Sequence, residues 1–209
     1  YYQSKIKVTT DHPQKIANHI LNMMSWGTNT INSILDIEGG DGSIAIEIAN
    51  RIDTHEGLSI TIIDPNCGPI IDSDLPYKIE SVDNIRDLHE SNSYDFIIAS
   101  AILEHIPELS NTLNHIFSML SPNGFLYIRT PYMVPIITFF SRFHIYIDFT
   151  YPGHLYDMGP VFWSTVINDK KTRYSLSIIS SKPSYVETSL FKHPFRTMMA
   201  AILKSPWYF

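Results

Sequence analysis

The stretch Ile34-Leu35-Asp36-Ile37-Glu38-Gly39-Gly40-Asp41-Gly42 decides the fold, together with the residues that follow it. Its first four residues are apolar except for Asp36, which predicts a short buried strand. Beyond the glycine-rich turn, isoleucines recur at helical spacing and predict a helix over residues 43–51. This order predicts an α/β fold in which backbone N–H groups and a helix N-terminus lie at the carboxyl edge of a parallel sheet.

The same alternation continues as far as Thr130. A helix is expected to follow Asp11 and Pro13, and another is expected over 107–120. Further strands are predicted at 58–63, 78–82, 94–99 and 125–130, with Pro122-Asn123-Gly124 as the turn into the last of these. Strands that alternate with helices predict a doubly wound, Rossmann-like and mostly parallel sheet with helices on both faces.

The remainder of the chain has a different character. Residues 173–180 and 185–191 alternate as strands do, so we expect a seven-stranded sheet, and residues 193–203 are expected to close the chain as a helix. Residues 133–160 are rich in aromatics, His and Pro without clean periodicity, which predicts an irregular lid over about 132–160. At 209 residues, the chain is expected to form one domain, 1–209.

Composition narrows the class of protein. A hydrophobic fraction of 44% and a charged fraction of 17% are typical of a globular domain. The net charge of −6 argues against a nucleic-acid partner, because phosphate binding needs a concentrated basic surface. The single cysteine, Cys67, and the lack of a secretory signal predict a cytoplasmic protein. No apolar run approaches the roughly 20 residues that a membrane span needs, so no span is expected. A homodimer is possible.

Two acidic residues suggest a nucleotide-like ligand. Asp36 ends the first strand, where its carboxylate can accept hydrogen bonds from an ammonium group. Asp64 ends the neighbouring strand, where a carboxylate can accept two hydrogen bonds from a ribose diol. This arrangement suits nicotinamide, flavin and S-adenosylmethionine cofactors equally.

Two later segments discriminate among these cofactors. Residues 94–105, Tyr-Asp-Phe-Ile-Ile-Ala-Ser-Ala-Ile-Leu-Glu-His, resemble the "FDxVxxxxxLEH" pattern of class I S-adenosylmethionine-dependent methyltransferases. Residues 120–128 resemble the "L-x-P-G-G-x-L-x-I" entry to that family's fifth strand. The resemblance runs from about Ile34 to Pro131. It implies S-adenosylmethionine as the cofactor and a methyltransferase acting on an oxygen or nitrogen of a small molecule, carbohydrate-linked or phosphorylated.

The resemblance also implies where the cofactor binds, residue by residue. The acid that ends the first strand and the glycine-rich turn would hold the methionine part of the cofactor, and the acid that ends the second strand would hold its ribose. The segment after the third strand would face the adenine, and the segment after the fourth strand would pass beneath the cofactor. These cofactor-binding residues are Asp36, Glu38, Gly39, Gly40, Gly42, Asp64, Pro65, Asp83, Asn84, Ser100, Ala101 and Ile102. Glu38 stands where the family has its first glycine, and a positive φ there would cost about 1 kcal/mol or more.

The acceptor side is expected in the lid. An oxygen or nitrogen acceptor needs a base to remove its proton, and histidine is suited to that role near neutral pH. The candidate catalytic residues are His154, His105, His144 and Tyr132, and the candidate substrate-binding residues are Arg129, Tyr151 and Tyr156. For His105 an alternative is open, because Glu104 and His105 could instead cap the next helix.

Three alternatives compete with a metal-free methyltransferase. His144, Asp148, His154 and Asp157 are metal-binding residue types, but their spacing matches no strong metal motif, so no metal ligand is predicted. A nicotinamide-dependent Rossmann oxidoreductase would explain Asp36, the glycines and Asp64, but not Leu103-Glu104-His105. A non-catalytic, methyltransferase-like binding protein would explain the irregular residue at Glu38.

Overall fold

The computed structural model describes residues 13–24, 31–52, 57–65, 75–88, 92–146, 153–181, 194–195 and 198. The chain divides into two compact units. The first comprises Tyr1–Ile102 with Glu108–Ile128, and the second comprises Leu103–Pro107 with Arg129–Phe209. That residues 1–209 form a single domain stays a prediction.

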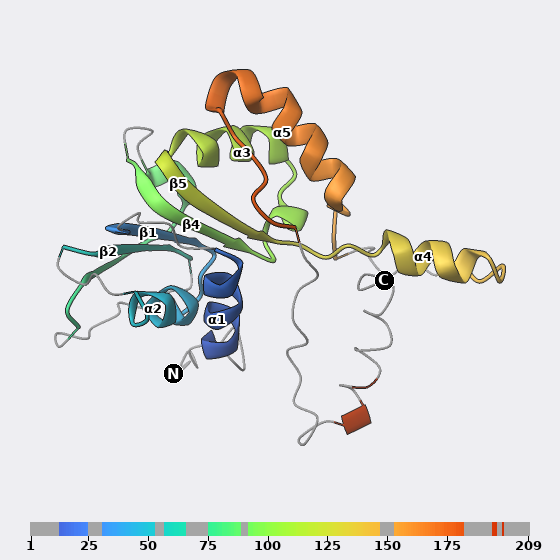
Figure 1. Cartoon of the computed structure of the whole chain (residues 1–209), viewed down its shortest axis with the longest axis horizontal. Helices are drawn as coiled ribbons and strands as arrows, with labels where there is room; N and C mark the ends of the chain where they lie inside the picture. Colours follow the sequence, from blue (N-terminus) through green and yellow to red (C-terminus); the bar gives the residue numbers. More distant parts are fainter. Residues whose placement is uncertain are drawn as a thin grey trace, which may run out of the picture. The chain divides into compact units, whose positions relative to one another are not determined.

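The first unit is built on a five-stranded sheet in the order β3-β2-β1-β4-β5 (Figure 1). Its strands are β1 Ser33–Ile37, β2 Ser59–Ile63, β3 Lys78–Val82, β4 Tyr94–Ser100 and β5 Leu120–Arg129. The pairs β1–β2, β1–β4 and β2–β3 are parallel. Because the order runs outward from β1 in both directions, the predicted doubly wound, Rossmann-like α/β arrangement is confirmed.

Helices cover both faces of this sheet. Helices α1 Pro13–Met23 and α2 Ser43–Ala49 lie on one face, and α3 Leu109–Ser118 lies on the other (Figure 1). Alternate strand residues, among them Ile34, Ile60 and Phe96, are buried in one cluster with apolar side chains of α1 and α2. Since successive strand residues point to opposite faces, the intervening Leu35 and Ile97 are buried on the other side.

The remaining elements are short turns and two helices of the second unit. The 3₁₀ turns are η1 Ile85–Asp87 and η2 Leu103–His105, and the helices are α4 Val134–Ser141 and α5 Pro160–Tyr174. The expectation of irregular structure over residues 133–160 is therefore wrong for residues 134–141. Pro135 lies in the first turn of α4, where proline is tolerated, and the nearly continuous apolar run hides any helical period.

The predicted strand over 173–180 is also wrong. Helix α5 continues to Tyr174, and residues 175–181 are neither helix nor strand. The helix ends only at Ser175, which adopts a left-handed φ of 48°. The other expected strand, 185–191, lies outside the described residues, as does most of the expected closing helix. Five of the seven predicted strands are thus present in the described part.

Residues 122–124 depart from the prediction in a smaller way. Strand β5 begins at Leu120, so the predicted Pro122-Asn123-Gly124 turn lies within the strand. Asn123 has a φ of 64°, which asparagine tolerates better than most residues, so a local turn is accommodated without ending the strand. In the stretches that the structure describes, no helix combines the length and apolarity that crossing a membrane requires. The cytoplasmic location and the homodimer stay predictions.

Candidate active site

The carboxyl ends of four strands meet at one edge of the first unit's sheet. Ile37 of β1 is in register with Ile63 of β2 and Ala99 of β4, and Ile63 is in register with Val82 of β3. The residues predicted to bind the cofactor follow directly on these positions. The structure therefore brings the turn after β1, Asp64 and Pro65, Asp83 and Asn84, and residues 100–102 to the same edge.

The glycine-rich turn is joined to the end of β2. Glu38, Gly40 and Gly42 have φ values of 51°, 59° and 70°, and Gly42 is the N-cap of α2. The Gly40 N–H donates a hydrogen bond to the Asp64 carboxylate at 3.0 Å. Glu38 thus has the positive φ for which a strain cost is expected. An L-residue in this conformation carries a cost of about 1–2 kcal/mol that glycine does not.

Asp36 is buried beneath the turn. Only 2% of it is exposed, and its Oδ2 has no hydrogen-bond partner among the described residues. Burial raises the pKa of Asp36 to about 7, although a hydrogen bond from the Ala45 backbone opposes the shift. A Cβ on Gly39 would lie 2.5 Å from Asp36 Cγ, so only glycine fits over this carboxylate. The unpaired oxygen matches the predicted role, because a ligand's ammonium group would supply the missing donor.

The segments after β3 and β4 differ in what they offer. Asp83 and Asn84 are exposed, and the Asn84 side chain accepts a hydrogen bond from the Arg86 N–H, which caps η1. Ser100 ends β4, and Ile102 is buried. Ala101 between them has a φ of 58°. Alanine gives no sequence signal of this conformation, so sequence analysis missed it.

In the second unit, two segments far apart in the sequence lie side by side. The Leu155 N–H donates to the Glu104 carbonyl at 2.8 Å, and the Tyr156 hydroxyl donates to the Pro107 carbonyl at 2.9 Å. These bonds hold the segment around residues 153–157 against residues 103–107. His154 is thereby brought to His105, and their ring centroids lie 5.1 Å apart.

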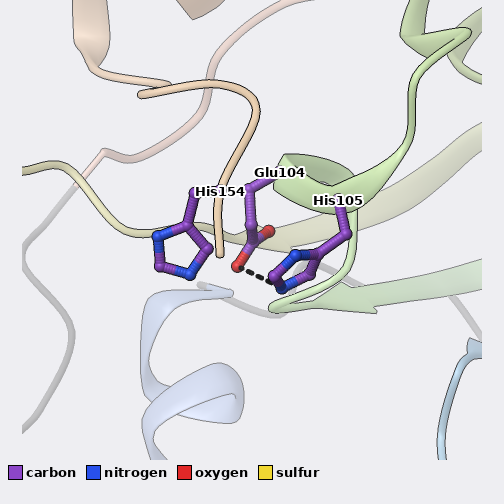
Figure 2. A group of neighbouring side chains, drawn as sticks. All are labelled: Glu104, His105 and His154. Atoms are coloured by element: carbon purple, nitrogen blue, oxygen red, sulfur yellow. Dashed lines mark ion pairs between the residues drawn. The ribbon is translucent and has the colours of Figure 1, made fainter. Parts of the chain in front are cut away.

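Glu104, His105 and His154 form the Glu–His cluster, in which the carboxylate and the two rings turn toward one another (Figure 2). His105 Nε2 lies 4.0 Å from Glu104 Oε1. Glu104 is 1% exposed, and neither its Oε2 nor His154 Nδ1 has a hydrogen-bond partner among the described residues. The alternative that Glu104 and His105 cap the next helix is wrong, because α3 begins at Leu109 with Glu108 as its N-cap. Sequence analysis therefore missed Glu104 as a member of this cluster.

The other predicted acceptor-side residues lie elsewhere in the second unit or outside the described residues. Tyr132 packs against Gly159, where an added Cβ would lie 2.2 Å from the ring. His144 is exposed beyond α4, has a φ of 58° and is not a member of the Glu–His cluster. Arg129 ends β5 and is half-buried, and Tyr156 uses its hydroxyl on Pro107. Tyr151 lies outside the described residues.

Among the described residues, His144, His154 and Asp157 do not form one metal-binding group. Asp157 accepts hydrogen bonds from the Met133 N–H on both carboxylate oxygens, at 3.1 and 3.0 Å, and thereby links the two ends of the lid. Asp148 lies outside the described residues. Of the three that the structure describes, only His154 is in the Glu–His cluster.

Comparison with known proteins decides the family. A family model described as a methyltransferase domain matches residues 10–144. The chain belongs to the class I S-adenosylmethionine-dependent methyltransferases. The predictions of a methyltransferase family and of S-adenosylmethionine as its cofactor are confirmed, and the nicotinamide alternative is set aside.

Two named relatives of this methyltransferase belong to different kinds of protein. The chain is 32% identical over 144 residues to the Dictyostelium discoideum protein named Probable polyketide synthase 26, covering 57% of the chain and 6% of that protein. It is 25% identical over 163 residues to a ubiquinone biosynthesis O-methyltransferase of Rickettsia bellii, covering 68% and 65%. The chain thus spans less than two thirds of either relative.

A solved structure supports the fold of this methyltransferase. The plantazolicin methyltransferase BpumL in complex with SAH aligns with a TM-score of 0.56 at 16% identity. The alignment covers 94% of this chain and 79% of that one. At this identity the likeness concerns the fold alone.

Proposed function

We propose that the chain binds S-adenosylmethionine at the carboxyl edge of its sheet and transfers the methyl group to an oxygen of a small-molecule acceptor. Two acids carry the proposal. Asp64 is held against the Gly40 backbone, and the buried Asp36 beneath the same turn has one oxygen, Oδ2, without a hydrogen-bond partner among the described residues. A carboxylate at each position complements a ligand that carries both an ammonium group and a ribose.

Each acid has a distinct task in this proposal. Asp36 accepts hydrogen bonds from the ammonium group, which supplies the donor that its buried Oδ2 lacks. Asp64 accepts hydrogen bonds from the ribose hydroxyls, while Gly40 keeps its carboxylate oriented. The backbone N–H groups of the turn and the N-terminus of α2 favour the negatively charged carboxylate in the methionine part of the cofactor.

When bound, S-adenosylmethionine supplies a methyl group that its sulfonium already activates. The chain's own residues therefore mainly align the acceptor and remove its proton. His154 and His105 are the proposed bases, with Glu104 beside them as a group that can orient an imidazole (Figure 2). His144 and Tyr132 stay predictions as catalytic residues. In sequence, His105 follows Ile102 of the predicted cofactor segment by three residues.

The relatives named for ubiquinone biosynthesis favour oxygen over nitrogen as the methyl acceptor. Arg129 would bind an anionic group of the acceptor, in keeping with the predicted phosphorylated or carbohydrate-linked substrate. Tyr151 and Tyr156 would line the site of the acceptor. These substrate assignments rest on residue type, since a guanidinium pairs with phosphate or carboxylate in a bidentate manner.

Calorimetric titration with S-adenosylmethionine and SAH tests the cofactor part. Asp64→Ala should weaken binding at least about 10-fold, because it removes a charge-assisted hydrogen-bond acceptor. Asp87→Ala is the matched control, since Asp87 is an exposed acid in η1 without a proposed role, and it should leave affinity unchanged.

Unchanged affinity in folded Asp64→Ala would remove Asp64 from the site, and a folded chain that binds neither compound would refute the proposal. SAH formation with phenolic, carbohydrate and phosphorylated acceptors then tests turnover. Binding without turnover on every acceptor would favour the non-catalytic alternative.

A further inference from the structure

We infer that the Glu–His cluster is a binding site for one divalent metal ion of the Zn²⁺ type. Glu104, His105 and His154 each offer one ligand atom, and these atoms all lie within 4.8 Å of one another (Figure 2). An ion bonded at about 2.0–2.1 Å in a tetrahedron holds its ligands about 3.4 Å apart. The cluster must therefore contract by at most about 1.4 Å, and the side chain of His105 is exposed and has room to move.

The donor set fits this class of ion. Two imidazole nitrogens and one carboxylate oxygen are a ligand combination used by catalytic zinc sites, which keep the fourth position for water or substrate. Imidazole favours zinc and its neighbours in the first transition row, whereas calcium and magnesium prefer all-oxygen sites. A transition-metal dication is therefore the occupant that this chemistry selects.

The unpaired polar atoms are the second, independent observation. Glu104 is 1% exposed, and its Oε2 has no hydrogen-bond partner in the described part of the chain. A buried carboxylate without a donor is unfavourable unless a cation neutralises it. A single metal ion would contact all three side chains, because each offers a ligand atom to the same space.

The backbone holds the ligands in place before an ion binds. Glu104 and His105 are consecutive residues of η2, and the Ile106 N–H closes that turn on the Leu103 carbonyl at 3.3 Å. The Leu155 N–H donates a hydrogen bond to the backbone carbonyl of Glu104. His154 directly precedes Leu155, so this bond holds His154 beside Glu104. Such preorganisation lowers the cost of ordering the site and favours metal binding.

If the proposed function holds, the ion takes over the task given above to the two histidines, because an imidazole nitrogen bonded to a metal cannot also accept a proton. An acceptor hydroxyl in the open position would lose its proton to water more readily, because a bound dication lowers the pKa of a coordinated oxygen. The oxygen then forms the new bond to the methyl carbon while the carbon–sulfur bond breaks and its electron pair returns to sulfur. The ion's oxidation state does not change.

Zinc binding to the tag-free, chelator-treated chain tests the inference without any acceptor. Calorimetry with Zn²⁺ should give one ion per chain, and Co²⁺ should give the visible absorption of a low-coordinate site. Glu104→Gln, His105→Gln and His154→Gln should each weaken zinc binding at least about 100-fold, because even the loss of a group that only contacts a metal's ligands costs about 10–100-fold. His144→Gln is the matched control, since this exposed histidine is outside the cluster, and it should bind zinc as the unmodified chain does.

Two results would overturn the inference: a folded chain that binds no zinc, or cluster variants that bind it as tightly as His144→Gln. Circular dichroism verifies that each variant folds, and the exposed His105 provides a variant with little risk to the core. S-adenosylmethionine affinity is measured on the same samples. A chain that binds S-adenosylmethionine but no zinc contradicts this inference alone, and a chain that binds zinc but neither S-adenosylmethionine nor SAH contradicts the proposed function alone.

Discussion

Replacing Glu38 by glycine should stabilise the chain. Glu38 is exposed and has a φ of 51° in the turn between β1 and α2, where an L-residue is strained. The left-handed conformation costs an L-residue about 1–2 kcal/mol relative to glycine. Glycine also gives the unfolded chain more conformational freedom, and this lowers the gain in stability by about 0.4–1 kcal/mol. The expected net gain in the free energy of unfolding is about 0.5–1 kcal/mol, or about 1–4 °C in Tm for a chain of this size.

Urea unfolding of the unmodified chain, Glu38→Gly and Glu38→Ala measures this gain. Alanine is the matched control, because it removes the same carboxylate and its contacts but keeps the Cβ that causes the strain. Glu38→Gly should raise the midpoint with an unchanged slope, and Glu38→Ala should not. If the two variants are equally stable, the backbone strain assigned to Glu38 is refuted.

Three further predictions concern buried positions. The pKa of Asp36 is raised from 3.8 to about 7 by burial, so the folded state holds a proton that the unfolded chain releases. The bound proton contributes fully to stability below about pH 4, and this contribution is lost as the pH rises to about 7. The free energy of unfolding should therefore fall by up to about 1.4 kcal/mol per pH unit over this range. Urea unfolding at several pH values should show this slope, and Asp36→Asn should abolish it. Gly39→Ala places a Cβ against the buried Asp36 side chain and should lower the free energy of unfolding by about 1–3 kcal/mol, whereas an unchanged urea midpoint would contradict the contact. Gly159→Ala should displace the Tyr132 ring and change the near-ultraviolet circular dichroism; an unaltered aromatic signal would show that the ring does not rest on Gly159.

Local patterns were sufficient for most of the sheet. The short apolar runs ending at Asp36 and Asp64 are buried strands, and the more polar and exposed β3 also lies where it was predicted. Patterns failed where they were ambiguous. Residues 173–180 alternate like a strand, yet a helix without an internal breaker runs on to Tyr174, because helix formation propagates cooperatively until a residue ends it.

The sequence by itself determined the α/β class, the family and the edge at which the cofactor residues gather. Each depends on local order along the chain, and in a parallel sheet that order dictates which strand ends meet. Tertiary structure alone decided the left-handed backbone at Ala101 and the meeting of His154 with Glu104 and His105. Nearly fifty residues separate the two halves of that cluster in the sequence. Hydrogen bonds such as that from Leu155 to the Glu104 carbonyl join them, and no residue pattern encodes such a backbone contact.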